Sequence, residues 1–354
     1  MQNAPPRKGP RMITATTYPR HPHVPEPARW QIEMATAFSS VAALARAVGL
    51  DPPASDPMVG DFKLRVPASY VRRMRRGDPQ DPLLLQVMPS FREQQEAHGY
   101  TADPVGEHAA LRAPSLLQKY SGRALLITTQ SCAIHCRYCF RREFPYADQS
   151  TDAPRWSAAL EEIARDETLE EIILSGGDPL SLSDLRLRSL TDNLAKIPHV
   201  RRLRIHTRQP IVLPSRVDSG LIAWLRGISL PTVFVLHCNH PNELDAEVIA
   251  ACAALRGAGV MLLNQSVLLR DVNDTVAVLA DLSRRLFDAG VLPYYLHVLD
   301  RVRGAAHFDV PETTARLIAG ELAARLPGYL VPRLVREVHG APAKVTLPAL
   351  FPGN

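Results

Sequence analysis

Short apolar stretches alternate with longer amphipathic stretches from residue 123 to residue 326. The apolar stretches are rich in Ile, Val and Leu and have the length of buried strands, whereas the stretches between them have the apolar spacing of helices. A strand followed by a helix, repeated along the chain, predicts a parallel α/β sheet. The predicted strands are 123–129, 170–175, 201–207, 232–237, 260–266 and 292–298, and the predicted helices are 155–168, 183–197, 214–228, 243–258, 274–289 and 311–326.

Polar and reactive side chains follow the ends of these strands rather than their starts. In parallel barrels the active site is built from the carboxyl ends of several strands. Because six units are too few for a closed eight-stranded barrel, we predict a partial, open (βα)6 barrel of the TIM type, with its site at that face. The polar segments are 129–139, 175–178, 206–208, 237–240, 264–266 and 297–300.

The chain before residue 123 has a different pattern. Residues 1–27 are rich in proline and are expected to form a flexible leader, whereas 28–50 and 66–77 are each expected to form a helix. The second of these contains four arginines between residues 72 and 76, which we interpret as a solvated helix face, with a phosphate-bearing or acidic partner as the alternative. The predicted organisation is a leader (1–27), a helical N-terminal region (28–115), the barrel (116–327) and a C-terminal segment (328–354).

The composition is that of an ordinary globular protein, with 354 residues of which 46% are hydrophobic and 22% charged. No apolar run is long enough to span a membrane, and a net charge of +5 on so long a chain does not favour a nucleic-acid-binding protein. The five cysteines are an odd number and follow no signal stretch, which favours a reducing, cytoplasmic location. Cys238 and Cys252 are isolated and are interpreted as core or near-site thiols.

The other three cysteines lie in one segment with the spacing C-x3-C-x2-C. Three soft thiolates on one loop suit either zinc, with His135 as a fourth ligand, or three irons of an iron–sulfur cluster. Structural zinc sites usually pair two C-x2-C segments, and no second one is present. A 4Fe-4S cluster held by three thiolates keeps one iron open, as catalytic metals require. The sequence therefore favours a 4Fe-4S cluster on Cys132, Cys136 and Cys139.

With an aromatic residue, Tyr138, just before the third cysteine, this segment resembles the radical S-adenosylmethionine superfamily. The resemblance implies that the open iron binds the methionine part of S-adenosylmethionine, which one electron cleaves to a 5'-deoxyadenosyl radical. It also implies the partial barrel. Two adjacent glycines, Gly176 and Gly177, follow the second predicted strand, where the superfamily binds the amino group of the methionine part. A tight turn without a ligand is the alternative interpretation of this pair. Gly176, Gly177 and Asp178 are expected to bind this cofactor, and His237 and Gln265 are further residues expected to bind a cofactor.

Lysine is rare in this chain, since only five of its 41 Lys and Arg residues are lysines. They are Lys8, Lys63, Lys119, Lys196 and Lys344. An amine can form a Schiff base with pyridoxal phosphate and a guanidinium cannot. Lys344 lies in a loop of small residues that would let a planar group approach the backbone. On these grounds alone, an ordinary exposed lysine is the simpler interpretation.

The chain from about residue 60 to its end resembles the lysine 2,3-aminomutases. This resemblance implies that Lys344 carries pyridoxal phosphate, that Tyr120 and Arg123 contact the cofactor, and that Lys119 is a neighbouring base. The segments that carry it are CRYCFRR (136–142), LSGGDPL (174–180), RIHTRQPIVLP (204–214), HCNHPNE (237–243), LNQSVLLR (263–270), PYYLHVLD (293–300) and GYLVP (328–332).

The same resemblance implies L-lysine as the substrate. Arg141 would bind its carboxylate, a task suited to a bidentate guanidinium, and Asp300 and Glu337 would hold its distant ammonium group. A relative that acts on glutamate would not place two acids there. The expected reaction moves the amino group from carbon 2 to carbon 3 and makes the enzyme an isomerase.

Two departures indicate a subtype. Residue 337 is Glu where the enzymes of lysine catabolism typically have Asp, and the chain stops ten residues after Lys344, without their cysteine-bearing extension. This shorter form, in which the segment HGAPAK (339–344) ends at Lys344, resembles the type that makes (R)-β-lysine for elongation factor P, to which a separate ligase attaches it. The expected partners are L-lysine, that ligase and an electron donor of the flavodoxin or ferredoxin type, with no membrane, no nucleic acid and a homo-oligomer as an option. The alternatives are a radical enzyme acting on RNA or another amino acid, and a non-catalytic iron–sulfur module.

Overall fold

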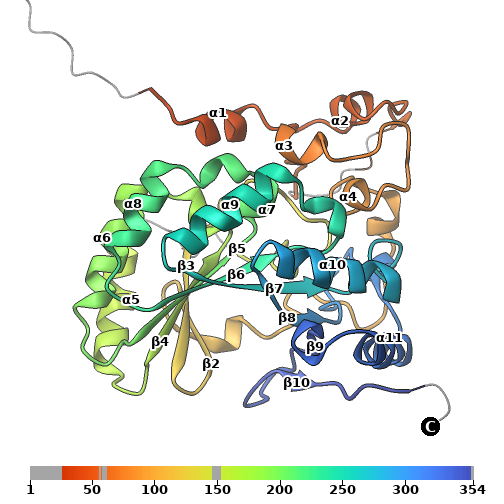
Figure 1. Cartoon of the computed structure of the whole chain (residues 1–354). Coiled ribbons are helices and arrows are strands. Elements are labelled where there is room, and N and C mark those ends of the chain that lie inside the picture. The colour runs from red at the N-terminus through yellow and green to blue at the C-terminus, as the bar shows by residue number, and fades with distance from the viewer. Residues whose placement is uncertain (1–25, 56, 58–61, 146–152, 352–354) are drawn as a thin grey trace, which may run out of the picture.

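The computed structural model describes residues 26–55, 57, 62–145 and 153–351, so the predicted leader lies almost wholly outside the described residues. Ten strands form one sheet in which the spatial order follows the chain order (Figure 1). Strands β3 to β9 are parallel neighbours, whereas β1 and β2 at one edge and β10 at the other run antiparallel to their neighbours. Among the described strands, β1 and β10 do not pair with each other, so the barrel is open. This confirms the predicted partial barrel.

All six predicted strands are present, within about one residue at each end. The structure adds four short strands and makes β9 a seventh parallel strand. The strands are β1 (Leu111–Ala113), β2 (Leu116–Tyr120), β3 (Arg123–Thr129), β4 (Glu171–Gly176), β5 (Arg202–Thr207), β6 (Thr232–His237), β7 (Met261–Val267), β8 (Leu292–His297), β9 (Arg333–Arg336) and β10 (Val345–Thr346).

A helix follows each of the six predicted strands, also as expected. Four of them begin at side-chain caps (Ser183, Asp218, Asp245 and Thr275), which accept hydrogen bonds from the unpaired N–H groups of the first turn. None of the described helices is long and apolar enough to cross a membrane. These helices are α5 (Ala153–Arg165), α6 (Asp184–Ala195), α8 (Ser219–Gly227), α9 (Ala246–Gly257), α10 (Val276–Asp288) and α11 (Glu312–Arg325), with the one-turn helix α7 (Gln209–Val212) after β5.

The N-terminal region is less helical than predicted. The single helix expected over 28–50 is two helices, because Phe38 leaves the helix to form a β-bridge with Val66 and Ser40 then caps the second helix. The helix expected over 66–77 is one turn long, and Gly77, in a left-handed conformation, closes the turns that follow it. The helices here are α1 (Arg29–Ala35), α2 (Val41–Ala47), α3 (Ala68–Val71) and α4 (Pro82–Leu85).

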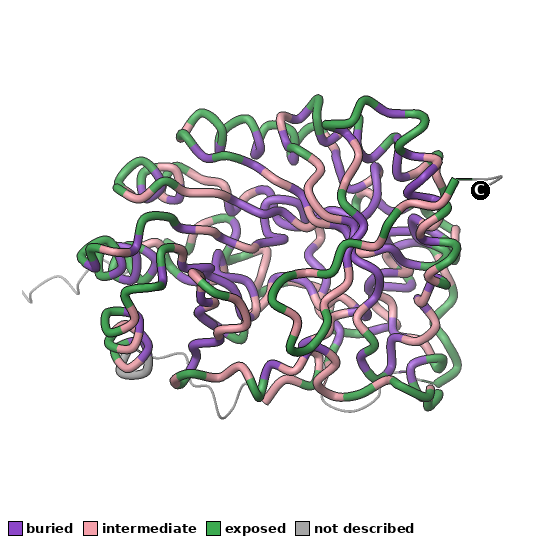
Figure 2. The backbone as a smooth tube through the Cα atoms, turned by 90° about the horizontal axis from the view of Figure 1, so that it is seen from below, coloured by how far each residue is buried: buried purple, intermediate pink, exposed green. Residues whose placement is uncertain are grey.

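The apolar faces of the barrel helices pack on the sheet and form the main core. A second core joins the N-terminal helices to the barrel, because Leu44, Leu64 and Tyr70 pack with Ile134 of the cysteine segment and Val212 after β5. Figure 2 shows the buried segments gathered in the interior and the exposed ones at the periphery. The N-terminal region therefore packs beside the carboxyl ends of the strands, where the site was predicted.

Candidate active site

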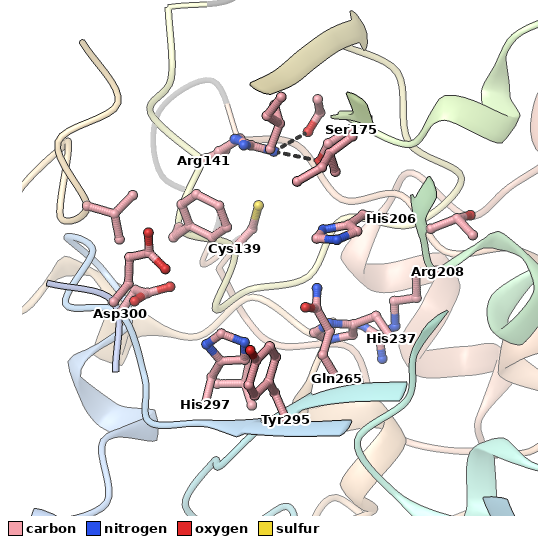
Figure 3. Close-up of a pocket in the computed structure, with 18 of the residues that line it drawn as sticks. Cys139, Arg141, Ser175, His206, Arg208, His237, Gln265, Tyr295, His297 and Asp300 are labelled. Atoms are coloured by element: carbon pink, nitrogen blue, oxygen red, sulfur yellow. Dashed lines mark hydrogen bonds between the residues drawn. The ribbon is translucent and has the colours of Figure 1, made fainter. Parts of the chain in front are cut away.

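One cavity of about 640 Å³ lies at the carboxyl ends of the parallel strands. In Figure 3, side chains from the cysteine segment and from the ends of β4 to β8 converge on it. The structure brings together every residue that the sequence predicted for the site. Its lining includes Tyr120, Arg123, Cys132, Cys136, Cys139, Arg141, Gly176, Gly177, Asp178, His237, Gln265, Asp300, Glu337 and Lys344.

The pairing of β9 with β10 places Lys344 next to Glu337. Val345 is the register partner of Arg336, so the residue before β10 faces the residue after β9. Lys344 Nζ donates a hydrogen bond to Glu337 Oε2 at 2.6 Å, and the Tyr120 hydroxyl donates to Glu337 Oε1 at 2.6 Å. Lys119 Nζ lies 3.5 Å from the same carboxylate. Burial alone would raise the pKa of Glu337, but the Lys344 ammonium and these hydrogen bonds lower it to about 2.

Asp300 follows β8, the parallel neighbour of β9, and lines the cavity with Glu337. Burial raises the pKa of Asp300 to about 7; the ammonium of Lys344 opposes this shift and the Glu337 carboxylate adds to it. Glu337 is therefore ionised at neutral pH, whereas Asp300 exchanges a proton there. A further ammonium group bound beside Asp300 would favour its ionised form.

The three predicted cluster ligands lie on the cavity wall after β3. Burial, with repulsion between neighbouring thiolates, raises the pKa of Cys132 and raises that of Cys139 to about 11, so a bound cation is needed to hold them as thiolates. Within the described residues, no group of three or more His, Cys, Asp and Glu side chains converges as one metal ion requires. His135 instead places Nδ1 2.7 Å from the Lys63 carbonyl. One ring nitrogen of His135 is thus engaged by this contact, and the three cysteines remain soft donors suited to a cluster.

The two glycines after β4 allow the cysteine segment to approach closely. A Cβ at Gly176 would lie 2.6 Å from the Thr129 carbonyl oxygen, and one at Gly177 would lie 2.5 Å from that of Ser131. The N–H of Gly177 donates to Thr129 and that of Asp178 to Ser131. These glycines are thus required for packing whether or not they also contact a ligand.

Asp178 points into the protein rather than into open space. Its carboxylate accepts hydrogen bonds from the Thr207 hydroxyl and from the backbone N–H groups of Leu180, Arg208 and Gln209. We therefore interpret Asp178 as a residue that positions the ends of β4 and β5 relative to each other.

Arg141 is paired with an acid that the sequence analysis did not identify. Glu107 accepts hydrogen bonds from Nε and Nη2 of Arg141 at 2.8 and 2.6 Å, and both side chains are buried. Arg141 Nη1 also donates to the Ser175 hydroxyl and the Gly176 carbonyl. The guanidinium is therefore held in one orientation at the cavity wall. Glu107 lies in the region for which only helices were expected, and no sequence signal distinguishes it from other acids.

The opposite part of the lining is basic and aromatic. Arg123 stacks over the Tyr120 ring at 4.6 Å, and Arg333 stacks over the Tyr295 ring at 4.9 Å. Arg204 also lines the cavity. Nearby, His206 Nε2 is buried without a partner among the described residues, and burial lowers the pKa of this imidazole well below its usual value. Guanidinium groups with an unsatisfied neutral imidazole suit an anionic, polar cofactor such as a phosphate ester.

The arginine run of residues 72–76 is occupied by contacts within the chain. Arg72 lies 3.4 Å from Glu247, Arg75 lies 3.0 Å from Asp78, and Arg73 is within 3.6 Å of Asp245. The pairs of Arg72 and Arg73 attach the N-terminal region to α9 of the barrel, whereas the Arg75 pair lies within the N-terminal region. They leave little support for the alternative in which the run binds RNA.

The comparisons with known proteins agree with this geometry. The family described as "4Fe-4S single cluster domain" matches residues 121–201. The L-lysine 2,3-aminomutase of Escherichia coli (strain K12) is 51% identical over 286 residues, 81% of this chain and 83% of that protein. The enzyme of the same name from Haemophilus influenzae is 43% identical over 92% of this chain and 97% of that protein. The one from Clostridium subterminale is 36% identical over 81% and 69%.

A solved radical S-adenosylmethionine methyltransferase, TsrM from Kitasatospora setae, aligns with a TM-score of 0.35 and 11% identity over 60% of this chain and 45% of that one. The sequence relatives carry the assignment. They confirm the predicted isomerase, and with the cluster-domain match they confirm the 4Fe-4S cluster and S-adenosylmethionine as its cofactors. The chain belongs to the L-lysine 2,3-aminomutase family of radical S-adenosylmethionine enzymes.

Proposed function

We propose that this enzyme converts L-lysine to (R)-β-lysine with pyridoxal phosphate bound to Lys344. The observation that carries the proposal is that the cluster cysteines, Lys344, Arg141 and the two acids line one cavity of about 640 Å³. A radical formed next to the cluster would therefore be generated in the same cavity as the substrate. Holding reacting groups together in this way supplies much of the rate enhancement in such a site.

The residues of the chain orient the substrate at both ends. Arg141, fixed by Glu107, would bind the α-carboxylate. Asp300 and Glu337 would bind the ε-ammonium, and Asp300 would lose its proton as that charge arrives, because burial raises its pKa to about 7 in the absence of lysine. Lysine alone among the common amino acids carries a flexible primary ammonium at this distance from its carboxylate.

The basic and aromatic end of the cavity would hold pyridoxal phosphate. Arg123, Arg204 and Arg333 would contact its phosphate. Lys119 and Lys344 both line the cavity near the acids, and Lys344 is the one that donates a hydrogen bond to Glu337. When bound, pyridoxal phosphate supplies the π bond across which the amino group moves, and S-adenosylmethionine on the cluster supplies the radical that removes hydrogen from carbon 3. Glu337 keeps the Lys344 amine at the cavity wall until the substrate takes its place.

We further infer that the β-lysine product is destined for elongation factor P, through a separate ligase. The support is the resemblance of the ending HGAPAK and of Glu337 to that subtype. The measurement is mass spectrometry of elongation factor P from cells with and without this chain. Absence of a β-lysyl mass increment in both would contradict this inference while leaving the aminomutase reaction standing.

The reaction itself is tested by anaerobic incubation with L-lysine, S-adenosylmethionine and a one-electron reductant, followed by chiral separation of the products. We expect β-lysine of R configuration and its loss when Lys344 is replaced by Ala. Lys196→Ala, a change on the exposed end of α6, serves as the matched control. Formation of 5'-deoxyadenosine without β-lysine would refute lysine as the substrate, and no 5'-deoxyadenosine would favour a non-catalytic module.

A further inference from the structure

A buried arginine contacts one of the predicted cluster ligands. Arg208, just after β5, donates a hydrogen bond from Nη1 to Cys136 Sγ at 2.7 Å and another from the same nitrogen to the Tyr138 hydroxyl at 2.6 Å. Its side chain is only 7% exposed. Its Nε is also buried and has no hydrogen-bond partner among the described residues. A full positive charge is therefore held against the cysteine segment in a place from which water is largely excluded.

The position of this charge is fixed from three directions. The backbone N–H of Arg208 donates to Asp178 at 2.7 Å, which ties it to the glycine turn after β4. Its Nη2 donates to Gln86 Oε1 at 2.7 Å and to Glu243 Oε2 at 3.0 Å. Glu243 is fully buried, and its other oxygen accepts from the backbone N–H groups of Asn239 and His240. Arg208 therefore cannot turn away from Cys136 without breaking a buried network.

With the cluster bound to Cys136, the order of the charges across this network would be thiolate, guanidinium, carboxylate. The guanidinium contacts the sulfur directly, whereas the carboxylate lies behind it. Reduction of a 4Fe-4S cluster adds one electron and, here, requires no proton transfer and no change of bonds. Nearby positive charge and N–H donors to cluster sulfur favour the reduced form, and nearby negative charge disfavours it.

We propose that Arg208 and Glu243 set the reduction potential of the cluster through Cys136, with Arg208 raising it and Glu243 lowering it. Arg208 is a positioning residue in this role, since it touches a cluster ligand rather than the substrate. The proposal rests on the cluster assignment and not on the identity of the substrate. In use, the electron comes from a one-electron donor protein, and in the test it comes from dithionite through redox mediators.

The test is an anaerobic potentiometric titration of the iron-loaded enzyme, followed by the electron paramagnetic resonance signal of the reduced cluster. We expect Arg208→Gln to lower the ratio of reduced to oxidised cluster at a fixed potential by about tenfold, a shift of about 59 mV for one electron. Glu243→Gln should raise the same ratio, with a shift of opposite sign. Arg208→Lys keeps the charge and should shift the ratio less than Arg208→Gln.

Arg216→Gln is the matched control. Arg216 is also fully buried and paired with a carboxylate, Asp184, but its hydrogen bonds run to Leu180 and Leu182 rather than to the cysteine segment. Opposite shifts in the Arg208 and Glu243 variants, with none in the control, would support the proposal, because general loosening of the fold would move both in the same direction. Shifts of the same sign, or none larger than the control, would overturn it. If Arg208→Gln retains no iron, the sign of the Glu243→Gln shift decides alone.

Discussion

Asp300→Asn should make the ligand-free enzyme more stable while weakening lysine binding. Burial raises the pKa of Asp300 from its ordinary value of 3.8 to about 7. The folded protein therefore disfavours the ionised carboxylate in the absence of a cation, and the amide removes that penalty. The same change removes a carboxylate from the proposed ε-ammonium site, which should weaken lysine binding about tenfold.

The size of the stability effect follows from the pKa shift. A pKa that is about three pH units higher means that the folded protein disfavours the ionised carboxylate by roughly 4 kcal/mol, at about 1.36 kcal/mol for each pH unit. Asp300 lines a cavity that admits solvent, so we take about half of this, roughly 2 kcal/mol, which for a chain of this size is about 3 °C in Tm. When the pKa of an acid is higher in the folded protein than in the unfolded chain, the protein loses stability as the pH rises from the unfolded-state pKa to the folded-state pKa. The gain in the variant should therefore be absent below about pH 4, near half its full size at about pH 5.5, and complete above about pH 7.

The assay is anaerobic thermal unfolding of iron-loaded protein without lysine, at about pH 5.5 and about pH 8. Asp192→Asn, on the exposed face of α6, controls for the general effect of removing a negative charge. A variant no more stable than the parent at the higher pH, or one whose advantage is larger at the lower pH, would refute the reasoning. In the presence of saturating lysine the advantage of the variant should shrink by about 1.4 kcal/mol, because tenfold weaker binding gives the variant that much less stabilisation from the ligand.

Three other changes test the rest of the site. Cys136→Ala should lose both the visible absorbance of the cluster and turnover, and turnover with no cluster would contradict the ligand assignment. Lys344→Ala should lose the visible absorbance of bound pyridoxal phosphate while keeping that of the cluster; a spectrum like that of the parent would exclude this lysine as the attachment point. Glu107→Gln should raise KM for lysine about tenfold through Arg141, with little change in KM for S-adenosylmethionine, and equal changes in both would indicate a folding defect instead.

The main sheet was predictable because its strands are short apolar runs separated by amphipathic helices, so the period of the pattern changes at each boundary. The strands β9 and β10 were missed because they are four and two residues long, and the short apolar pair of β9 is flanked by Arg333 and Arg336. In the N-terminal region, Ser40 could have indicated the start of a second helix, since serine is a common cap. The bridge from Phe38 to Val66 depends on residues far apart in sequence and left no such signal.

The site residues fall into two classes with different predictability. Those with reactive groups at strand ends, such as the cysteines, Lys344 and Asp300, could be found from residue type, spacing and family resemblance. Those that hold them, such as Glu107 and Glu243, became visible only in three dimensions, because one buried acid resembles any other acid in a sequence. Arg208 lies within one of the family segments, so its importance was indicated, but its contact with Cys136 was not.

The open seam of the barrel explains how Lys344, the proposed attachment point of pyridoxal phosphate, can reach the site from so far along the chain. Tyr120 and Lys119 belong to β2 near one edge of the sheet, whereas Glu337 and Lys344 belong to the β9–β10 hairpin at the other. Glu337 accepts hydrogen bonds from Tyr120 and Lys344, so side chains rather than backbone hydrogen bonds join the two edges. A closed barrel fills its interior with side chains and leaves no space of this size. The missing strands therefore create the cavity, and the charged contacts across the seam place the reactive amine at its wall.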